Sequence, residues 1–338
     1  MSGGVDSSVA AALLIDAGHD VVGATMKLWG GPSDQGCCSV ADVDDARRVC
    51  HQLGIDHHVF NFTEDFEAHV VAPYLGAHAL GRTPNPCIEC NRHLKFDRFL
   101  ARARQLGFDA VATGHHARVV RAADGAYELR RGADANKDQS YVLHMLDQES
   151  LARTLLPVGT MTKTEVRAHA EARGLRTAAK PDSQDTCFLP QTGGRETFLG
   201  ARIPLRSGRV VDGEGNDVGE IDAVELVTVG QRRGLGVSGT AAVYAVDVDT
   251  ARAVVTVGPL DDLLRTDQGV DALTWVRAPV AAGTTVLVQT SAHGDTHAAT
   301  FTGDGVAWDK PQRRVAPGQS VVLYAADDDA VLGGGLAR

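Results

Sequence analysis

The sequence lacks any long uninterrupted run of apolar residues, and it has no basic segment followed by an apolar one near its start. A membrane-spanning helix needs roughly 20 consecutive apolar residues, and a secretion signal needs the basic and apolar pair. We therefore expect a cytoplasmic protein with no membrane partner. Aromatic residues make up only 5% of the 338 residues, so aliphatic side chains must fill the core.

Cysteine is scarce as well, with six residues in the whole chain. So few cysteines in a chain of this length do not indicate a disulfide scaffold, and they favour thiol chemistry or a metal site. The 33 basic residues are outnumbered by 43 acidic ones, which gives a formal charge of −10. This charge argues against nucleic-acid binding, but paired arginines such as Arg232 and Arg233 allow local basic patches.

The order of predicted helices and strands divides the chain into two parts. The first part alternates helices with strands, which is typical of a parallel sheet. Within it, Asp124 and Gly125 predict a hairpin turn, and Thr162 with Glu165 predicts a capping box that opens a helix. The predicted helices are 9–17, 41–53 and 92–106, and the predicted strands are 21–26, 59–62 and 109–113.

Beyond about residue 200, short alternating strands separated by Gly, Pro and Asp replace the helices. We predict an α/β fold in which an N-terminal parallel-sheet domain is followed by two small β-rich domains, the last of them a β-barrel. The predicted domains are residues 1–195, 196–263 and 264–338.

Residues 2–8 read SGGVDSS and lie at the start of the first predicted helix. Backbone N–H groups in such a glycine loop can cradle a phosphate, although a simple glycine turn capped by Asp6 is the alternative. The segment resembles the PP-loop of the ATP pyrophosphatase superfamily, whose N-terminal domain has the adenine nucleotide alpha hydrolase-like fold. Members normally carry an apolar strand before this loop, and here only Met1 precedes it. We therefore expect the natural chain to start further upstream.

Three cysteines lie in unusual segments, namely Cys87 and Cys90 in TPNPCIECN and Cys187 in KPDSQDTCF. A helix predicted to begin near Asn91 would place Cys90 just before its N-terminus, where the helix dipole lowers the pKa of a thiol. Half of a zinc site is the alternative for the CxxC pair, but the chain has no second CxxC. The cysteines that we expect to be small buried packing residues are Cys37, Cys38 and Cys50.

The glycine loop and the two cysteine segments are accompanied along the chain by three further motifs, GHHA (114–117), KDQSY (137–141) and GQRRGLG (230–236). Together they resemble the bacterial tRNA-specific 2-thiouridylase family over essentially the whole chain. The resemblance implies ATP-dependent 2-thiolation of the wobble uridine of tRNA, with ATP and Mg²⁺ used to adenylate the 2-carbonyl and a cysteine persulfide delivering sulfur. It also implies tRNA and a sulfur donor, such as a cysteine desulfurase or a sulfur relay protein, as partners.

The resemblance assigns roles to individual residues. Cys187 matches the persulfide carrier, and Cys90 matches the nucleophile that forms a disulfide with it. The strip that meets the target base is Asn85, Pro86 and Cys87. The ATP site is Ser2, Gly3, Gly4, Val5, Asp6, Ser7, Ser8, Val9, Met26 and Gly114. The tRNA-contacting positions are His115, Lys137, Asp138, Gln139 and Gln319, to which we add the basic pair Arg232 and Arg233.

Two positions depart from the family pattern. Cys87 stands where many relatives have an acidic residue, which leaves the general base unassigned. Ser291 stands where many have an arginine, and Arg313 and Arg314 could replace that contact with tRNA.

Other functions remain open at this point. A thiol at position 87 raises the alternative that Cys87, Cys90 and Cys187 bind a four-iron four-sulfur cluster, although we favour the persulfide and disulfide route. Another PP-loop ATP pyrophosphatase, such as an amide ligase or synthetase, would share the loop without needing the thiols. A non-catalytic RNA-binding module is the alternative from a different class.

Overall fold

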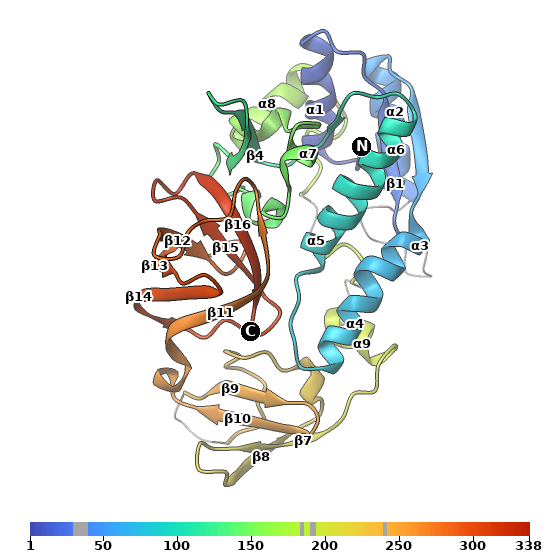
Figure 1. Cartoon of the computed structure of the whole chain (residues 1–338). Helices are drawn as coiled ribbons and strands as arrows, with labels where there is room; N and C mark the ends of the chain where they lie inside the picture. Colours follow the sequence, from blue (N-terminus) through green and yellow to red (C-terminus); the bar gives the residue numbers. More distant parts are fainter. Residues whose placement is uncertain (30–39, 183–185, 190–193, 239–241) are drawn as a thin grey trace.

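The computed structural model (Figure 1) describes residues 1–29, 40–182, 186–189, 194–238 and 242–338. The N-terminal α/β part lies at the top of Figure 1, a barrel lies on its lower left, and a smaller sheet lies at the bottom. This arrangement confirms the predicted α/β class with β-rich parts after it. Two of the predicted packing residues, Cys37 and Cys38, lie outside the described residues.

The N-terminal part is built on two pairs of parallel strands. β1 (Gly23–Lys27) pairs with β2 (His57–Asn61), and β3 (Val111–Ala112) pairs with β6 (Thr154–Leu155). In the described ranges β1 and β3 pair with no further strand, although the N-terminal nitrogen of Met1 donates a hydrogen bond to the Ala24 carbonyl of β1, so the sheet is interrupted between them. This interruption lies within the sheet for which we expected a further strand.

Three helices pack together beside these strands. They share an apolar cluster that includes Val5, Val9, Val49 and Val166. The predicted capping box of Thr162 and Glu165 is confirmed at the start of the third helix. The helices are α1 (Val5–Asp16), α2 (Val40–Leu53) and α8 (Lys163–Ala172).

The helix expected over 92–106 is longer than predicted and begins at Pro86. It runs through α5 (Pro86–Glu89), a π-helical stretch η2 (Cys90–Arg98) and α6 (Phe99–Gln105). Asn85 caps it by accepting a hydrogen bond from the Cys87 backbone N–H at 3.0 Å. Asparagine is a preferred N-cap residue and proline is favoured in the first turn, so the local sequence explains the earlier start. The prediction that Cys90 precedes the helix is therefore wrong, because Cys87 lies in its first turn.

The described part of the chain has one more long helical segment and several short helices. A second continuous helical segment comprises α3 (Thr63–Phe66), η1 (Glu67–Val71) and α4 (Ala72–Ala79). In the part of the chain that is described, no helix is long and apolar enough to cross a membrane. The others are η3 (Ser140–Leu143), α7 (Gln148–Leu151), η4 (Pro157–Thr160), α9 (Gly194–Gly200), η5 (Val224–Leu226) and η6 (Leu260–Leu263).

The small sheet at the bottom of Figure 1 has the strand order β8-β7-β10-β9. Its two hairpins are antiparallel, and the central pair of β7 and β10 is parallel. The strands are β7 (Gly208–Val211), β8 (Asp217–Ile221), β9 (Tyr244–Asp249) and β10 (Val254–Gly258).

The predicted C-terminal barrel is confirmed. Six strands form a closed barrel, because β11 (Leu264–Trp275) pairs with both β14 (Gly305–Arg313) and β16 (Ala330–Ala337). Buried aliphatic and aromatic side chains such as Val288, Phe301 and Leu323 form its core. The strands are β11 (Leu264–Trp275), β12 (Thr285–Gln289), β13 (His297–Phe301), β14 (Gly305–Arg313), β15 (Ser320–Tyr324) and β16 (Ala330–Ala337).

The predicted hairpin of the N-terminal part also forms, as β4 (Ala117–Arg121) and β5 (Tyr127–Arg131). Its second strand pairs with β16, with Leu129 opposite Val331. The hairpin thereby extends the sheet of the barrel, which the sequence did not indicate.

Candidate active site

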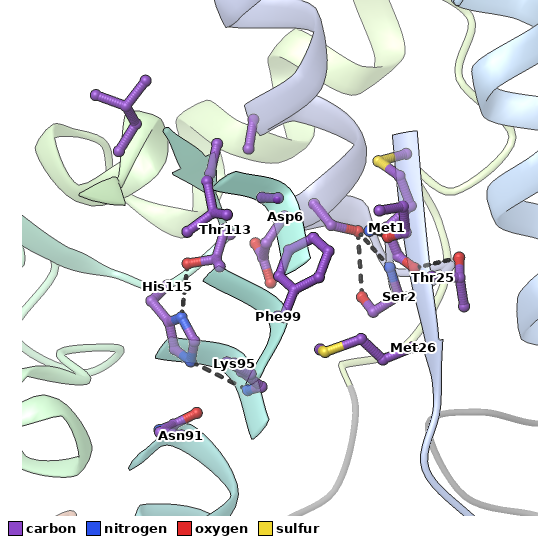
Figure 2. Close-up of a pocket in the computed structure, with 18 of the residues that line it drawn as sticks. Met1, Ser2, Asp6, Thr25, Met26, Asn91, Lys95, Phe99, Thr113 and His115 are labelled. Atoms are coloured by element: carbon purple, nitrogen blue, oxygen red, sulfur yellow. Dashed lines mark hydrogen bonds between the residues drawn. The ribbon is translucent and has the colours of Figure 1, made fainter. Parts of the chain in front are cut away.

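A cavity of about 990 Å³ lies in the N-terminal part (Figure 2). Its wall combines the glycine loop, β1, β3, the helix that begins at Pro86, the segment around Cys187 and residues 292–293 of the barrel. The predicted site residues that it brings together are Ser2, Asp6, Ser7, Met26, Pro86, Cys87, Cys90, Gly114, His115, Asp138, Gln139 and Cys187.

The cavity has an apolar side and a polar side. The apolar side lies between β1 and β3, where the sheet is interrupted, and includes Leu14, Val22, Val111 and Leu155. The polar side carries the hydroxyl, carboxylate, lysine and thiol groups.

The glycine loop is shaped by two close backbone contacts. Gly3 has φ +71°, and a Cβ there would lie 2.4 Å from the carbonyl oxygen of Asp42, so only glycine fits. A Cβ at Gly114 would lie 2.7 Å from the backbone nitrogen of Ser7, which shows how closely this strand end approaches the loop.

The hydroxyl groups of the loop point in two directions. Ser2 Oγ and Ser7 Oγ lie 3.1 Å apart at the cavity, whereas Ser8 is buried and donates to the carbonyl of Gly4 at 2.8 Å. Gly4 caps α1 without a side-chain hydrogen bond, so the first N–H groups of this helix can bind an anion. Hydroxyls and helix N–H groups at one spot fit a polyphosphate. The predicted ATP residues Val5 and Val9 are buried behind the loop and support it from the core.

Asp6 of the loop is held by two side chains from distant segments. Lys163 Nζ lies 2.8 and 2.7 Å from its two carboxylate oxygens, and His116 Nε2 lies 3.1 Å from one of them. Burial raises the pKa of Asp6, but the hydrogen bonds from His116 and Lys163 outweigh it and leave that pKa below its ordinary value. Asp6 is therefore ionised at neutral pH.

Asp182, five residues before Cys187 in the sequence, belongs to the same group of charges. Asp182 lies 2.9 Å from Lys163 Nζ, 2.8 Å from Lys137 Nζ and 2.8 Å from an Arg167 nitrogen. Burial raises the pKa of Asp182, but hydrogen bonds from Lys137 and Lys163 lower it to about 2. Sequence reasoning missed both Lys163 and Asp182 as site residues. The only local signal for Lys163 was its place in the first turn of a capped helix.

The residue after Cys187 is buried among aromatic side chains. Phe188 lies in an aromatic cluster, with ring centroids 5.0 Å from Phe198, 5.5 Å from Tyr74 and 5.6 Å from Phe66. Cys90 belongs to the same apolar cluster, and Cys187 packs against it. The structure thus brings the two predicted catalytic cysteines to one cluster at the cavity wall.

The other described cysteines differ in their surroundings. Cys50 is fully buried on α2, as expected for a packing residue, and burial raises the pKa of its thiol. Cys87 lines the cavity but does not belong to the cluster that contains Cys90. Within the described ranges, no group of three or more His, Cys, Asp or Glu side chains is arranged to hold a metal ion.

Several predicted tRNA-contacting residues are engaged inside the protein. His115 is only 8% exposed, and it bonds Thr113 Oγ1 at 2.7 Å and Lys95 Nζ at 3.3 Å. The Asp138 carboxylate accepts hydrogen bonds from Arg131 at 2.7 Å, from the Gly132 N–H at 2.8 Å and from Ser140. These residues can reach only a nucleotide that enters the cavity.

Among the remaining predicted tRNA positions, Gln139 lines the cavity and the others lie outside it. Lys137 is paired with Asp182, and Arg232 and Arg233 are exposed in the turn of residues 230–236. Gln319 donates a hydrogen bond to the carbonyl of Thr83 and so ties the barrel to the TPNP segment. Gln139 accepts from the His116 N–H at 2.9 Å beside the glycine loop.

Three family models match the chain in succession. They are described as the tRNA methyl transferase HUP domain over residues 1–191, the tRNA methyl transferase PRC-barrel domain over 196–259 and the aminomethyltransferase beta-barrel domain over 269–337. The order matches the observed α/β part, small sheet and barrel.

Curated relatives match over almost the whole chain, and each of the following is named tRNA-specific 2-thiouridylase MnmA. The relative from Chloroflexus aurantiacus is 48% identical and is aligned over 99% of this chain and 96% of its own. The relative from Herpetosiphon aurantiacus is 46% identical over the same shares. The relative from Mycolicibacterium smegmatis is 46% identical over 97% of this chain and 95% of its own.

Proposed function

The chain belongs to the tRNA-specific 2-thiouridylase family, and from this premise we propose that it replaces the 2-carbonyl oxygen of the wobble uridine of tRNA with sulfur, at the expense of ATP. One observation carries the proposal: the glycine loop and three cysteines line one cavity. A phosphate loop alone would suit an amide ligase or synthetase, but such an enzyme has no use for thiols beside the loop. Methyl transfer, named in two of the family descriptions, requires neither the loop nor the thiols.

We assign the ATP site to the polar side of the cavity. Ser2, Ser7 and the first N–H groups of α1 would hold the phosphates, Gly114 allows their close approach, and Met26 lines the adjacent wall. Asp6, which is ionised, would hold the Mg²⁺ ion that accompanies ATP. ATP supplies AMP as a leaving group, because the uracil carbonyl is a poor electrophile until its oxygen is activated.

We assign sulfur transfer to Cys187 and Cys90. The terminal sulfur of a persulfide on Cys187 attacks C2 of the activated uridine, and the bond from C2 to the adenylated oxygen breaks as AMP leaves. The Cys90 thiolate then attacks the inner sulfur of Cys187, which releases the 2-thiouridine and forms a disulfide between the two cysteines. The shared cluster of Cys90 and Cys187 supports this division of roles. A cellular reductant and a sulfur donor, such as a cysteine desulfurase or a sulfur relay protein, restore the persulfide.

The target base enters beside the first turn of the helix that begins at Pro86. Asn85, Pro86 and Cys87 form this turn, and Gln319 of the barrel contacts the segment just before it. Arg232 and Arg233 supply phosphate contacts outside the cavity, and His115 with residues 137–139 lines the route of the nucleotide. We divide the chain into an ATP-binding catalytic domain (1–195), a central β-rich domain (196–263) and a C-terminal barrel domain (264–338).

The test is ATP-dependent incorporation of labelled sulfur from cysteine into unmodified tRNA, in the presence of a cysteine desulfurase and a reductant. We expect 2-thiouridine at the wobble position, detected by mass spectrometry of nuclease digests, with wild-type protein. Omission of ATP and substitution Cys187→Ser should each abolish the product. If wild-type protein yields no thiolated nucleoside under these conditions, the proposed function is wrong.

A further inference from the structure

The cavity wall has an uneven distribution of charge. Among its described residues, Lys95 is the only lysine or arginine, whereas four residues contribute carboxylates, namely Asp6, Asp20, Asp109 and Asp138. A cavity that receives a nucleoside triphosphate and an RNA backbone must neutralise several negative charges. The single basic side chain on its wall is therefore well placed to act on the reacting phosphate.

Lys95 is directed toward the cavity by the geometry of its helix. Cys87, Asn91 and Lys95 are spaced by four residues and all line the cavity, as expected for one face of a helix. Lys95 also follows Cys90 by five residues, and the segment Cys90–Arg98 is π-helical, with hydrogen bonds between residues five apart. This register keeps Lys95 on the same side of the helix as Cys90. π-helical stretches often occur at functional sites.

The contact with His115 orients Lys95 without neutralising it. An ammonium group can only donate, so His115 Nε2 accepts the hydrogen bond at 3.3 Å. His115 Nδ1 then carries the ring proton and donates it to Thr113 Oγ1 at 2.7 Å. Figure 2 shows these two hydrogen bonds running from Thr113 through His115 to Lys95.

Three other lysines provide a contrast with Lys95. Each of them pairs with at least one aspartate, whereas no carboxylate of the described residues lies within ion-pair distance of Lys95. Burial lowers the pKa of His115 and keeps its ring neutral, so this histidine positions a lysine that has no carboxylate partner among the described residues. The paired lysines are Lys137, Lys163 and Lys180.

On this basis we infer that Lys95 is a catalytic residue of the adenylation step, and that His115 is its positioning residue. The inference rests on the proposed function. The O2 atom of uridine attacks the α-phosphorus of ATP, the bond from phosphorus to pyrophosphate breaks, and the N3 proton of the base passes to water. Lys95 exchanges no proton; it donates a hydrogen bond to a non-bridging oxygen of the α-phosphate while negative charge builds up there.

The test uses the full chain with unmodified tRNA and measures single-turnover pyrophosphate release. Lys95→Met preserves most of the side-chain length and removes the charge, and we expect it to slow adenylation by about 10²- to 10³-fold, as for the loss of one oxyanion donor. The dissociation constants of ATP and tRNA should change little, and Lys95→Arg should restore part of the rate. Arg98→Met is the matched control, because Arg98 lies on the same π-helical stretch but is exposed and paired with Asp65 at 3.1 Å.

A second measurement separates a phosphate contact from a structural effect. ATP analogues with sulfur at either non-bridging α-oxygen should slow the wild-type enzyme unequally, because one of these oxygens contacts Lys95. Lys95→Met should lose that difference between the two diastereomers, and His115→Ala should reduce it, whereas Arg98→Met should retain it. A Lys95→Met enzyme that keeps the wild-type difference, or that loses only tRNA affinity, would overturn the inference.

Failure of the inference about Lys95 can be distinguished from failure of the proposed function. Wild-type protein that forms no 2-thiouridine contradicts the function itself. Wild-type protein that forms it, together with a Lys95→Met variant that adenylates tRNA at the wild-type rate, contradicts only the role of Lys95.

Discussion

Lys163 binds both carboxylate oxygens of Asp6, at 2.8 and 2.7 Å, although 157 residues separate the two in the sequence. The same ammonium lies 2.9 Å from Asp182, five residues before Cys187. One lysine thus connects the loop proposed to bind ATP with the segment proposed to carry sulfur. The ATP and sulfur-transfer steps that we propose would therefore share a structural support.

The first prediction is that Lys163→Met destabilises the protein and impairs both half-reactions. Lys163 is 12% exposed, and its removal leaves two carboxylates close together without their shared cation. We expect a loss of about 1–3 kcal/mol in the free energy of unfolding, measured by urea denaturation, and slower pyrophosphate release. Lys310→Met, an exposed lysine of the barrel, is the control and should behave as wild type. Unchanged stability in the Lys163 variant would contradict the shared support.

The second prediction concerns acid stability. The pKa of Asp182 is about 2 in the folded protein, below the ordinary value of 3.8, so this carboxylate stabilises the fold through its ionised form. The contribution of Asp182 to the free energy of unfolding is complete above pH 3.8 and is lost as the pH falls toward 2. Asp182→Asn should therefore lower the midpoint temperature of thermal unfolding near neutral pH. As the pH falls, this midpoint should decrease less in the variant than in wild type. Parallel curves for the two proteins below pH 4 would exclude this role.

The third prediction separates sulfur transfer from adenylation. Phe188 is 6% exposed and packs against four aromatic rings, so Phe188→Ala removes the anchor of the adjacent Cys187. We expect thiolation to fall more than pyrophosphate release does, with a loss of about 3–5 kcal/mol in stability. Phe188→Leu fills much of the space and should recover most of the thiolation. An equal loss of both activities in a folded Phe188→Ala protein would argue against an anchoring role.

The features that the sequence could predict are local ones. The glycine loop, the CxxC segment, the hairpin at Asp124 and the capping box at Thr162 are short motifs whose residues contact one another. The earlier start of the helix that contains Cys90 was also predictable, since Asn85 followed by Pro86 is a typical helix start.

The features that it could not predict depend on distant pairings. Neither the contact between Asp6 and Lys163 nor the pairing of β5 with β16 leaves a periodic signal in the chain. Lys95 has the sequence context of an ordinary lysine on a helix surface. Only the π-helical register and the position of His115 reveal that it faces the cavity.

The fourth prediction concerns RNA binding by a protein of formal charge −10. Replacing Arg232 and Arg233 together with alanine should weaken tRNA binding. In a plot of the logarithm of the binding constant against the logarithm of salt concentration, the slope should become shallower by about 1 to 2 units. The matched control is Arg209→Ala with Arg252→Ala, two exposed arginines of the β7–β10 sheet and its turn. If both double variants bind tRNA alike over a salt series, the turn of residues 230–236 has only a structural role.

The last prediction assigns separate roles to the three cysteines at the cavity. Cys90 and Cys187 share one apolar cluster, Cys87 lies outside it, and the described residues offer no preformed metal site. We therefore expect Cys90→Ser and Cys187→Ser to lose thiolation while retaining pyrophosphate release, and Cys87→Ser to retain part of both activities.

The measurement is made on protein purified without oxygen, so that an oxygen-sensitive cluster would survive. Iron and sulfide analysis is run beside the thiolation assay for each variant. A mixed disulfide of Cys90 and Cys187 should appear by mass spectrometry after one turnover without reductant, and it should be missing from either single variant. Stoichiometric iron and sulfide, combined with a Cys87→Ser protein as inactive as the other two, would instead establish the iron–sulfur mechanism, because only a shared cluster makes all three thiolates equally necessary.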